Sequence, residues 1–435
     1  MASRKRIAGI VLAVAAVGVA GLGWSRLNVS RSNVADDKVT LADAKSGDTA
    51  AIERGAYVMR TGDCLACHTA GKGEFAGGYA IDTPFGQIMS SNITPDRETG
   101  IGAMTERDFF KAVRHGQGSK GLLYPAMPYT AYQRLSDEDM HDLWAYLSTV
   151  KPVSNEVHEN AGLGFPFNIR YAMAGWNLLF FDNRGFTPTP GLSPQAKRGQ
   201  YLVDGGTHCA ACHSPRNLLG AEIGSRYLQG GNLGDWYAPD LTPNPHSGLG
   251  SEPEEGIVEY LRTGSNGVSV ASGPMAEAVE HSFQHLTEDD LKSIATYLKT
   301  LPASPGGRPA ALAANTPAMQ RAALRYEVNC SACHGVRGEG MGGMTAAFAG
   351  NRALQSDDVT SLLHVMMVGG RAASTKEKPT GAGMPSFAWK MDDRQIAETL
   401  DYIRNSWGNA AKPIDESDVA RMRAQLQAAK QLPAN

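Results

Sequence analysis

The chain has 435 residues, of which 42% are hydrophobic and 20% are charged, and its formal net charge is -3. This is ordinary globular composition, which excludes a disordered, collagen-like or mostly membrane-embedded chain. Nucleic-acid backbones are bound by clustered lysine and arginine, so this charge balance also argues against DNA or RNA as a partner. At roughly 150 residues per domain, the length predicts about three domains.

Residues 1–28 are predicted to be a targeting or anchoring segment. The basic run Arg4-Lys5-Arg6 precedes an uncharged stretch from Ile7 to Ser25, which is long enough for a membrane span. A cleaved signal peptide is the alternative, because Gly18-Val19-Ala20 would serve as a cleavage site. Both alternatives carry the rest of the chain across the membrane, since basic residues stay on the cytoplasmic side.

A cysteine motif that returns twice later in the chain begins at Cys64-Leu-Ala-Cys67-His68. Cysteines three apart lie on one face of a helical turn, where both thiols can reach the two vinyl groups of one porphyrin. The histidine that follows can then place its imidazole on the iron, as c-type haem attachment requires. The three motifs use all the cysteines of the chain, and their residues are Cys64, Cys67, His68, Cys209, Cys212, His213, Cys330, Cys333 and His334.

Two other uses of C-x-x-C pairs fit this pattern less well. A zinc site takes two such pairs, or one pair with two distant histidines, whereas here an odd number of pairs each has an adjoining histidine. A thioredoxin-like redox pair needs a βαβ setting and gives no reason for the histidine. The motifs therefore predict three covalently bound haem c groups with iron.

The segment between the first two motifs, residues 152–189, is rich in aromatic residues. It contains Phe165-Pro-Phe-Asn-Ile-Arg170 and then a mostly uncharged stretch from Tyr171 to Phe181, which we expect to be helical. One interpretation is a helix packed between two haem domains. The other is a surface for a partner subunit, the membrane interface or a quinone head group, since clustered aromatic residues suit such boundaries.

The sequence around the motifs repeats as well, which predicts tandem domains over residues 48–151, 190–302 and 315–410, followed by a tail over 411–435. Three windows of equal length, residues 135–147, 286–298 and 391–403, each carry tyrosine at the twelfth place. Ser136, Thr287 and Asp392 have capping-box spacing, and apolar residues then recur at helical intervals. Each domain is expected to run from an entering helix through the haem motif to a closing helix, with glycine or tyrosine letting the two helices cross closely.

A haem iron that is bound by histidine needs a sixth ligand, and methionine is expected because a thioether raises the reduction potential relative to a second imidazole. Three methionines stand beside proline or glycine. Two of them lie eight and seven residues ahead of the first and third closing windows, and the other is the one methionine between Met173 and Met319. The predicted iron ligands are therefore Met127, Met275 and Met384, together with His68, His213 and His334. The competing ligands are His115, His281, His285, His364 and, for the third haem, Met391, whereas His208 is expected only to modulate its neighbouring site.

No motif for chemistry on a substrate is found beside the haem motifs. Gly338, Gly340 and Gly343 have the spacing of a dinucleotide-binding loop, but that spacing is informative only after a strand of a βαβ unit. Here it follows a haem motif, so we interpret it as a loop that lets backbone approach the porphyrin edge.

With these residues in view, the chain resembles the three-haem cytochrome c subunit of membrane-bound bacterial dehydrogenases. The resemblance covers nearly everything after residue 50. It implies a mainly α fold of three tandem class I cytochrome c-like haem domains behind a membrane anchor or signal segment. The motifs that carry it, besides the three haem motifs, are Ser91-Asn-Ile-Thr-Pro95, Tyr124-Pro-Ala-Met-Pro128, Phe165-Pro-Phe-Asn-Ile-Arg170 and Asn405-Ser-Trp-Gly-Asn409.

In that family a separate large subunit oxidises the substrate with pyrroloquinoline quinone, flavin or a molybdenum cofactor, and the cytochrome passes the electrons to ubiquinone. The resemblance implies the same relay here, on the periplasmic side of the bacterial inner membrane, with the large subunit and a further small subunit as candidate partners. The long N-terminal apolar segment favours an aldehyde dehydrogenase over an alcohol dehydrogenase. The alternatives are a flavin-dependent gluconate or sugar dehydrogenase, a stand-alone electron shuttle, and a haem enzyme such as a peroxidase.

Overall fold

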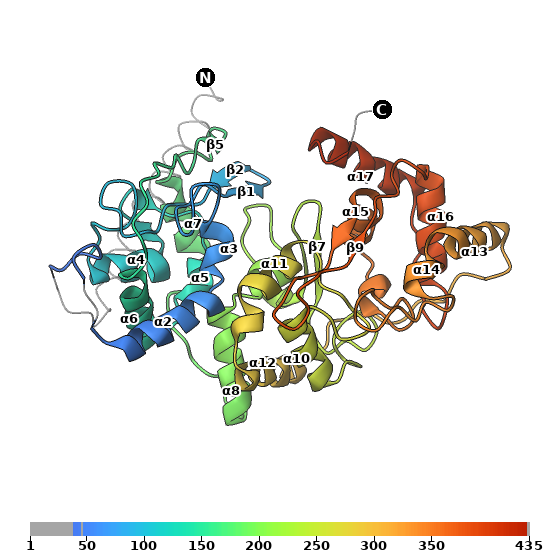
Figure 1. Ribbon diagram of the computed structural model, residues 1–435, viewed down its shortest axis with the longest axis horizontal. Coiled ribbons are helices and arrows are strands. Elements are labelled where there is room, and N and C mark those ends of the chain that lie inside the picture. Colours follow the sequence, from blue (N-terminus) through green and yellow to red (C-terminus); the bar gives the residue numbers. More distant parts are fainter. Residues whose placement is uncertain (1–37, 45–46, 433–435) are drawn as a thin grey trace, which may run out of the picture. The chain divides into compact units, whose positions relative to one another are not determined.

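The computed structural model describes residues 38–44 and 47–432 and is mainly helical, as predicted (Figure 1). It consists of two compact units. The first contains the described residues up to Gly191 together with Tyr201–His208, and the second contains Leu192–Gln200 and the described residues from Cys209 onward. The predicted anchor or signal segment, residues 1–28, lies outside the described residues. Among the helices of residues 38–44 and 47–432, none is long and apolar enough to cross a membrane.

Short strands and helices alternate in the first unit, where β1, β2 and β5 form one antiparallel sheet and β3 and β4 form a second. The Phe165–Pro166 peptide bond is cis. In chain order the elements are α2 (Thr49–Thr61), α3 (Cys64–His68), β1 (Ala80–Thr83), β2 (Gly86–Met89), α4 (Glu106–His115), β3 (Gln117–Gly118), β4 (Gly121–Leu122), α5 (Tyr129–Tyr132), α6 (Asp137–Leu147), β5 (Gly162–Leu163) and α7 (Ala172–Phe180).

The second unit contains two haem motifs and two antiparallel strand pairs, β6 with β7 and β8 with β9. Its elements, with η1 and the end of α8 belonging to the first unit, are α8 (Pro194–Tyr201), η1 (Leu202–Gly206), α9 (Ala210–His213), η2 (Gly224–Arg226), β6 (Gln229–Asn232), β7 (Tyr237–Asp240), α10 (Glu254–Thr263), α11 (Pro274–His281), η3 (Phe283–His285), α12 (Glu288–Thr300), α13 (Pro317–Asn329), α14 (Ser331–His334), η4 (Arg352–Gln355), α15 (Thr360–Val368), β8 (Gly370–Arg371), β9 (Gly383–Met384), α16 (Asp393–Arg404) and α17 (Glu416–Ala428).

Each haem motif stands between an entering helix and a closing helix. We name these segments repeat 1 (α2 to α6), repeat 2 (α8 to α12) and repeat 3 (α13 to α16). The three predicted closing helices are confirmed, and each begins at the predicted cap: Ser136, Thr287 and Asp392 accept a hydrogen bond from the backbone N–H three residues later. The side chain of Gln395 also reaches back to the backbone of Asp392, which completes a capping box there.

The entering and closing helices cross at a glycine in repeats 1 and 2. A Cβ atom on Gly55 would lie 1.8 Å from the carbonyl oxygen of Asp142, and one on Gly199 would lie 1.8 Å from that of Ser293. Beside the first crossing, the Arg54 guanidinium donates to both carboxylate oxygens of Asp142 at 2.7 and 2.9 Å. The predicted close crossing at glycine is therefore confirmed in these repeats.

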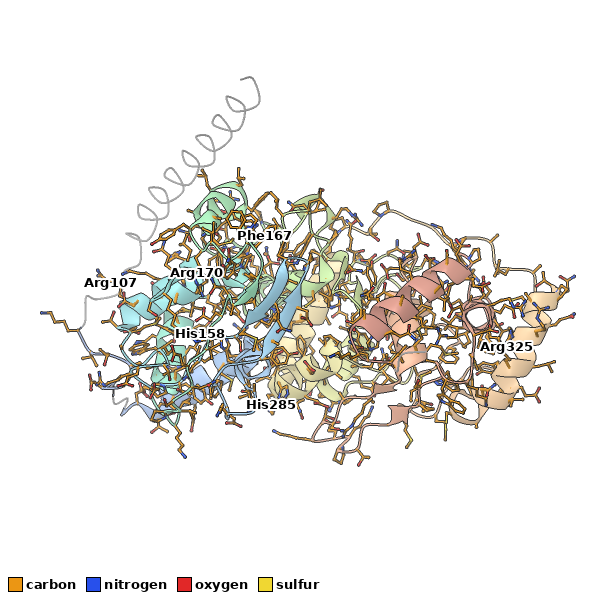
Figure 2. All side chains as sticks on the ribbon, turned by 90° about the horizontal axis from the view of Figure 1, so that it is seen from above. Arg107, His158, Phe167, Arg170, His285 and Arg325 are labelled. Carbon is orange, nitrogen blue, oxygen red and sulfur yellow. The ribbon has the colours of Figure 1, made fainter. Side chains whose placement is uncertain are left out.

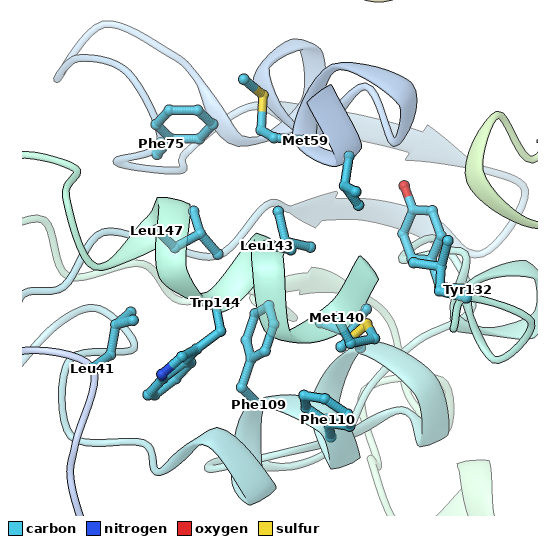
Figure 3. Packing of buried hydrophobic residues seen from close by; sticks show 13 residues of the cluster. Leu41, Met59, Phe75, Phe109, Phe110, Tyr132, Met140, Leu143, Trp144 and Leu147 are labelled. Carbon is cyan, nitrogen blue, oxygen red and sulfur yellow. The ribbon is translucent and has the colours of Figure 1, made fainter. Parts of the chain in front are cut away.

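The core of repeat 1 is formed by side chains from α2, α4 and α6. Met59, Phe109, Phe110, Met140 and Trp144 are buried in one cluster, as Figure 3 shows. The rings of Phe109 and Trp144 lie 5.6 Å apart and are tilted by 48°. Removing such side chains from water stabilises the repeat by roughly 1.5–3 kcal/mol each.

Repeat 2 has one residue more than repeat 1 between the arginine of its entering helix and its first cysteine. The extra residue is absorbed by η1, a π-helix over Leu202–Gly206, since a π turn holds one residue more than an α turn. The cysteine pair can therefore follow its helix at the same point in the turn despite the longer spacing.

Candidate haem-attachment sites

All three C-x-x-C-H motifs fold as a single helical turn that ends at the histidine. These turns are α3 in repeat 1, α9 in repeat 2 and α14 in repeat 3. All cysteines of the chain lie in the described residues, and none of them forms a disulfide there. Both thiols of each pair are therefore on one turn next to an imidazole, as thioether attachment requires.

The three motif histidines are oriented in the same way. Nδ1 of His68 lies 2.7 Å from the backbone oxygen of Ser91, Nδ1 of His213 lies 2.7 Å from that of Pro239, and Nδ1 of His334 lies 2.9 Å from that of Ala346. A carbonyl can only accept, so Nδ1 carries the proton and Nε2 keeps its lone pair. Nε2 is then the nitrogen that can bind iron, with the carbonyl fixing the plane of the ring.

Burial keeps these histidines neutral. It lowers the pKa of His68, His213 and His334 below the ordinary histidine value, and the hydrogen bond to the carbonyl only partly offsets this. Neutral imidazole is the form that binds a metal. Burial also raises the pKa of the Cys64 thiol to about 12, so before attachment this thiol is protonated.

A loop with little room for side chains lies against each haem motif. The N–H of Gly77 donates to the carbonyl of His68, and the N–H of Gly340 donates to that of His334, both at 2.8 Å. Both glycines have φ of 70°, in the left-handed region that favours glycine. In repeat 2, a Cβ on Gly231 would lie 2.2 Å from the carbonyl oxygen of Cys212.

The glycine loop of repeat 3 follows the helix α14, not a strand. Besides the bond from Gly340, Gly338 packs against the ring of Trp407, where a Cβ would lie 2.6 Å from the indole. The loop therefore brings backbone against the haem motif. Its approach to the porphyrin edge stays a prediction.

The predicted methionine ligands lie in three different local settings. Met127 is half-buried just before α5 and packs, like Cys64, against the core cluster of repeat 1. Met275 lies in the first turn of α11. Met384 lies in β9 and packs against the cluster that contains Met367 and Met391. Repeat 1 thus brings its methionine and its haem motif to one cluster, and ligation of iron by the three sulfurs stays a prediction.

The competing side chains have contacts of their own. His115 Nδ1 lies 2.8 Å from Oδ1 of Asn183, and Met391 is a core residue that is 4% exposed. His364 is 5% exposed. The ring of His208 lies edge-on to that of Tyr132 at 5.5 Å, and its hydrogen bond goes to the backbone of Gly62, beside the first haem motif. His281 and His285 also take part in polar or ring contacts.

Comparison with known proteins assigns each motif to a cytochrome region. The family model "Cytochrome c" matches residues 196–302 and 320–407, and the model "Cytochrome C oxidase, cbb3-type, subunit III" matches residues 50–147. The gluconate 2-dehydrogenase cytochrome c subunit of Pantoea cypripedii is 38% identical over 405 residues, which cover 88% of this chain and 91% of that protein. The cytochrome c subunit of the quinone alcohol dehydrogenase of Gluconacetobacter polyoxogenes is 39% identical over 404 residues, 88% of this chain and 86% of that protein.

This chain belongs to the family of dehydrogenase cytochrome c subunits. A dihaem cytochrome c-type protein of Cereibacter sphaeroides is also 37% identical, but over 59% of this chain and 88% of its own length. The predictions of covalently bound haem c and of an electron-transfer cytochrome subunit are confirmed at the level of the family.

The aromatic segment of this cytochrome subunit has two kinds of residue. Met173, Ala174 and Asn177 of α7 are buried, and the amide oxygen of Asn177 accepts a hydrogen bond of 2.6 Å from the Tyr129 hydroxyl. A second set, which we call the apolar surface, is exposed, and Figure 2 labels one of its members, Phe167. The apolar surface consists of Phe165, Phe167, Ile169, Tyr171, Leu178 and Leu179.

The sequence carries no signal for several partners of these sites. The carbonyls that orient the histidines belong to Ser91, Pro239 and Ala346, three unrelated residue types. The one sequence signal concerns Ser91 and Pro239, which occupy equivalent positions just ahead of the two similar Thr-Pro turns. The tail predicted over residues 411–435 contains the helix α17, whose Val419 and Leu426 are fully buried against repeat 3.

Proposed function

We propose that this chain binds three haem c groups and relays electrons from the catalytic subunit of a periplasmic, membrane-bound aldehyde or alcohol dehydrogenase to ubiquinone. The observation that carries the proposal is the shared geometry of His68, His213 and His334. His68 is buried and the other two are half-buried. Each is bonded through Nδ1 to a backbone carbonyl and preceded by its cysteine pair on one helical turn. The same construction three times supports three haems and not two.

The residues of each repeat suit this cofactor. The cysteine pairs would form the thioethers, the motif histidines would bind iron through Nε2, and Met127, Met275 and Met384 would supply the sixth ligand. A bound haem would take up and release one electron at a time at its iron. The protein would raise the reduction potential by its thioether ligands and by burial, so that the relay accepts electrons from a metabolic oxidation.

The apolar surface supports a membrane-facing role for the first unit. Phe165 is 82% exposed, Tyr171 is 74% exposed and Leu179 is 64% exposed. All residues of this surface come from the short segment 165–179, and clustered exposed apolar side chains are typical of protein or membrane contact sites. We propose that this surface faces the bilayer, where the chain is anchored or peripherally attached and where ubiquinone is reduced.

The comparisons and the N-terminal sequence favour different substrates for the complex. A relative from an alcohol dehydrogenase and one from a gluconate dehydrogenase are almost equally similar, at 39% and 38% identity. The second candidate function is therefore the cytochrome subunit of a flavin-dependent gluconate or sugar dehydrogenase. A molybdenum-dependent aldehyde dehydrogenase stays our first choice because of the long apolar N-terminal stretch.

Purification of the holoprotein from its native membrane in mild detergent tests the proposal. We expect three haems per chain and a large copurifying protein with molybdenum, pyrroloquinoline quinone or flavin, and the cofactor identifies the substrate class. Two haems per chain would contradict the proposed count. Three haems with no partner would favour an electron shuttle, and rapid cyanide or carbon monoxide binding at neutral pH would instead indicate an open iron position, as in a peroxidase.

A further inference from the structure

The hairpin of β6 and β7 is held against the haem motif of repeat 2. The carbonyl of Pro239 in β7 accepts the hydrogen bond from His213. On the other strand, the backbone of Gly231 lies so close to Cys212 that a side chain there would clash with its carbonyl. The base of the hairpin is therefore packed directly against the haem motif.

The tip of the same hairpin contacts the segment that carries Met275. The N–H of Leu233 donates to the carbonyl of Trp236 at 2.8 Å and closes the tip. The indole of Trp236 then covers Gly273, where a Cβ would lie 2.4 Å from the ring. Gly273 has φ of 55° and ψ of -140°, a conformation that favours glycine. The ring thus packs on the backbone immediately ahead of Pro274 and Met275.

Repeat 3 holds the hairpin tip in place. The imidazole of His364 in α15 lies 4.2 Å from the Trp236 ring at 35°, and its Nδ1 lies 3.3 Å from Oδ2 of Asp235. Ser361 of the same helix accepts a hydrogen bond from the N–H of Tyr237 at 2.8 Å and donates one to its carbonyl at 3.0 Å. The tip is therefore held by repeat 3, whereas the base of the hairpin packs on the haem motif of repeat 2.

The backbone completes the connection between the two methionine segments. Ser272, just ahead of Gly273, pairs in an antiparallel bridge with Ala372. Ala372 follows β8, and Gly370 of β8 pairs with Met384 of β9. The segments that carry Met275 and Met384 are therefore neighbours of one small backbone ladder.

We propose that Trp236 is a positioning residue for the methionine ligand of the second haem, and that His364 of repeat 3 holds Trp236 in that position. This inference rests on the proposed ligation of iron by Met275. The ring restrains the Gly273–Met275 backbone, which would hold the sulfur in one place for binding to the iron of the second haem. Without the ring the segment would be less restrained, a weaker hold on the sulfur ligand would result, and the reduction potential of the second haem would be lower.

The test uses the full-length holoprotein and two measurements, the near-infrared charge-transfer band of methionine-bound ferric haem and the midpoint potential of each haem. Met275→Leu identifies the component that belongs to the second haem, about one third of the band when three haems contribute equally. Trp236→Leu is expected to remove the same component and lower the same potential, whereas Trp236→Phe retains both. Trp176→Leu, which removes a half-buried indole from the first unit, is the matched control and leaves the band intact.

The outcomes separate the inference from the proposed function. In one outcome, Met275→Leu loses its component of the band, but Trp236→Leu keeps the whole band and an unchanged potential. This result overturns the positioning role of Trp236 and still supports ligation by Met275. An unchanged band in Met275→Leu overturns the ligation itself. If Trp236→Leu does not accumulate as holoprotein, the midpoint potential of the second haem is measured in His364→Ala instead. A lowered potential supports the inference, and an unchanged potential refutes it.

Discussion

Substitution of Gly55 by alanine is expected to destabilise repeat 1, although alanine is the better helix former. The added Cβ would lie 1.8 Å from the carbonyl oxygen of Asp142 and 2.8 Å from Cβ of Tyr146. Both neighbours belong to α6, so the two helices must separate by about 1 Å, which is overpacking of a kind that costs roughly 1–3 kcal/mol or more. The higher helix propensity of alanine relative to glycine offsets about 1 kcal/mol of this cost at most. We expect a net loss of about 2 kcal/mol, because separation also stretches the bond between Arg54 and Asp142.

Differential scanning calorimetry of the holoprotein measures this loss, since it resolves the transitions of separate cooperative units. A loss of this size lowers the melting temperature of a domain of this length by about 10 °C. Gly71→Ala is the control, because no atom lies within 4 Å of its added Cβ. Repeat 3 has Ala322 after the arginine of its entering helix, fully buried, so Ala322→Gly should not stabilise it. A Gly55→Ala protein that melts at or above the wild-type temperature would refute the reasoning.

Three further predictions follow from the same structure. Burial raises the pKa of Asp401 to about 6, above its value in the unfolded chain. The folded state therefore binds this proton more tightly, and its stability falls as the pH rises from about 4 to 6. Asp401→Asn should stabilise the protein more at pH 7 than at pH 4 in thermal melts. Met127→Leu and Met384→Leu should each remove a separate component of the near-infrared methionine band and lower one midpoint potential. Replacing Phe165 and Tyr171 by serine should slow ubiquinone reduction by the assembled complex about tenfold while electron transfer to a water-soluble acceptor is unchanged.

Each of these predictions has an outcome that contradicts it. Equal stabilisation by Asp401→Asn at both pH values would mean that the carboxyl does not titrate differently in the folded state. A band that survives either methionine substitution would move the sixth ligand of that haem to another side chain. Equal loss of activity with both acceptors would assign the apolar surface to contact with the dehydrogenase subunit and not to the membrane.

The closing helices could be predicted from the sequence because their signals are local. Ser136, Thr287 and Asp392 cap the helices that they were predicted to cap, and the glycine at the crossing is visible as a repeated Arg-Gly pair, Arg54-Gly55 and Arg198-Gly199. The haem motifs are equally local, since the two thioether cysteines and the histidine ligand lie within five consecutive residues.

Contacts between distant segments could not be predicted in this way. Trp236 and His364 are far apart in the chain, and neither stands in a pattern that marks it. The sequence presents His364 only as a competing iron ligand, whereas its ring packs on the indole of Trp236. The exposure of Phe165 and Tyr171 could not be predicted either, because an aromatic stretch has the same sequence pattern whether it is buried or exposed. Pairing of this kind depends on tertiary structure, which periodicity does not report.

The carbonyls that orient the three motif histidines have a consequence for how such chains diverge. An acceptor on the main chain is supplied by every amino acid, so a substitution at Ser91, Pro239 or Ala346 leaves the acceptor in place as long as the loop keeps its course. The identity of these positions is therefore free to drift while the imidazole keeps its tautomer. The three repeats illustrate this, since a serine, a proline and an alanine each supply the carbonyl that accepts the hydrogen bond from the motif histidine.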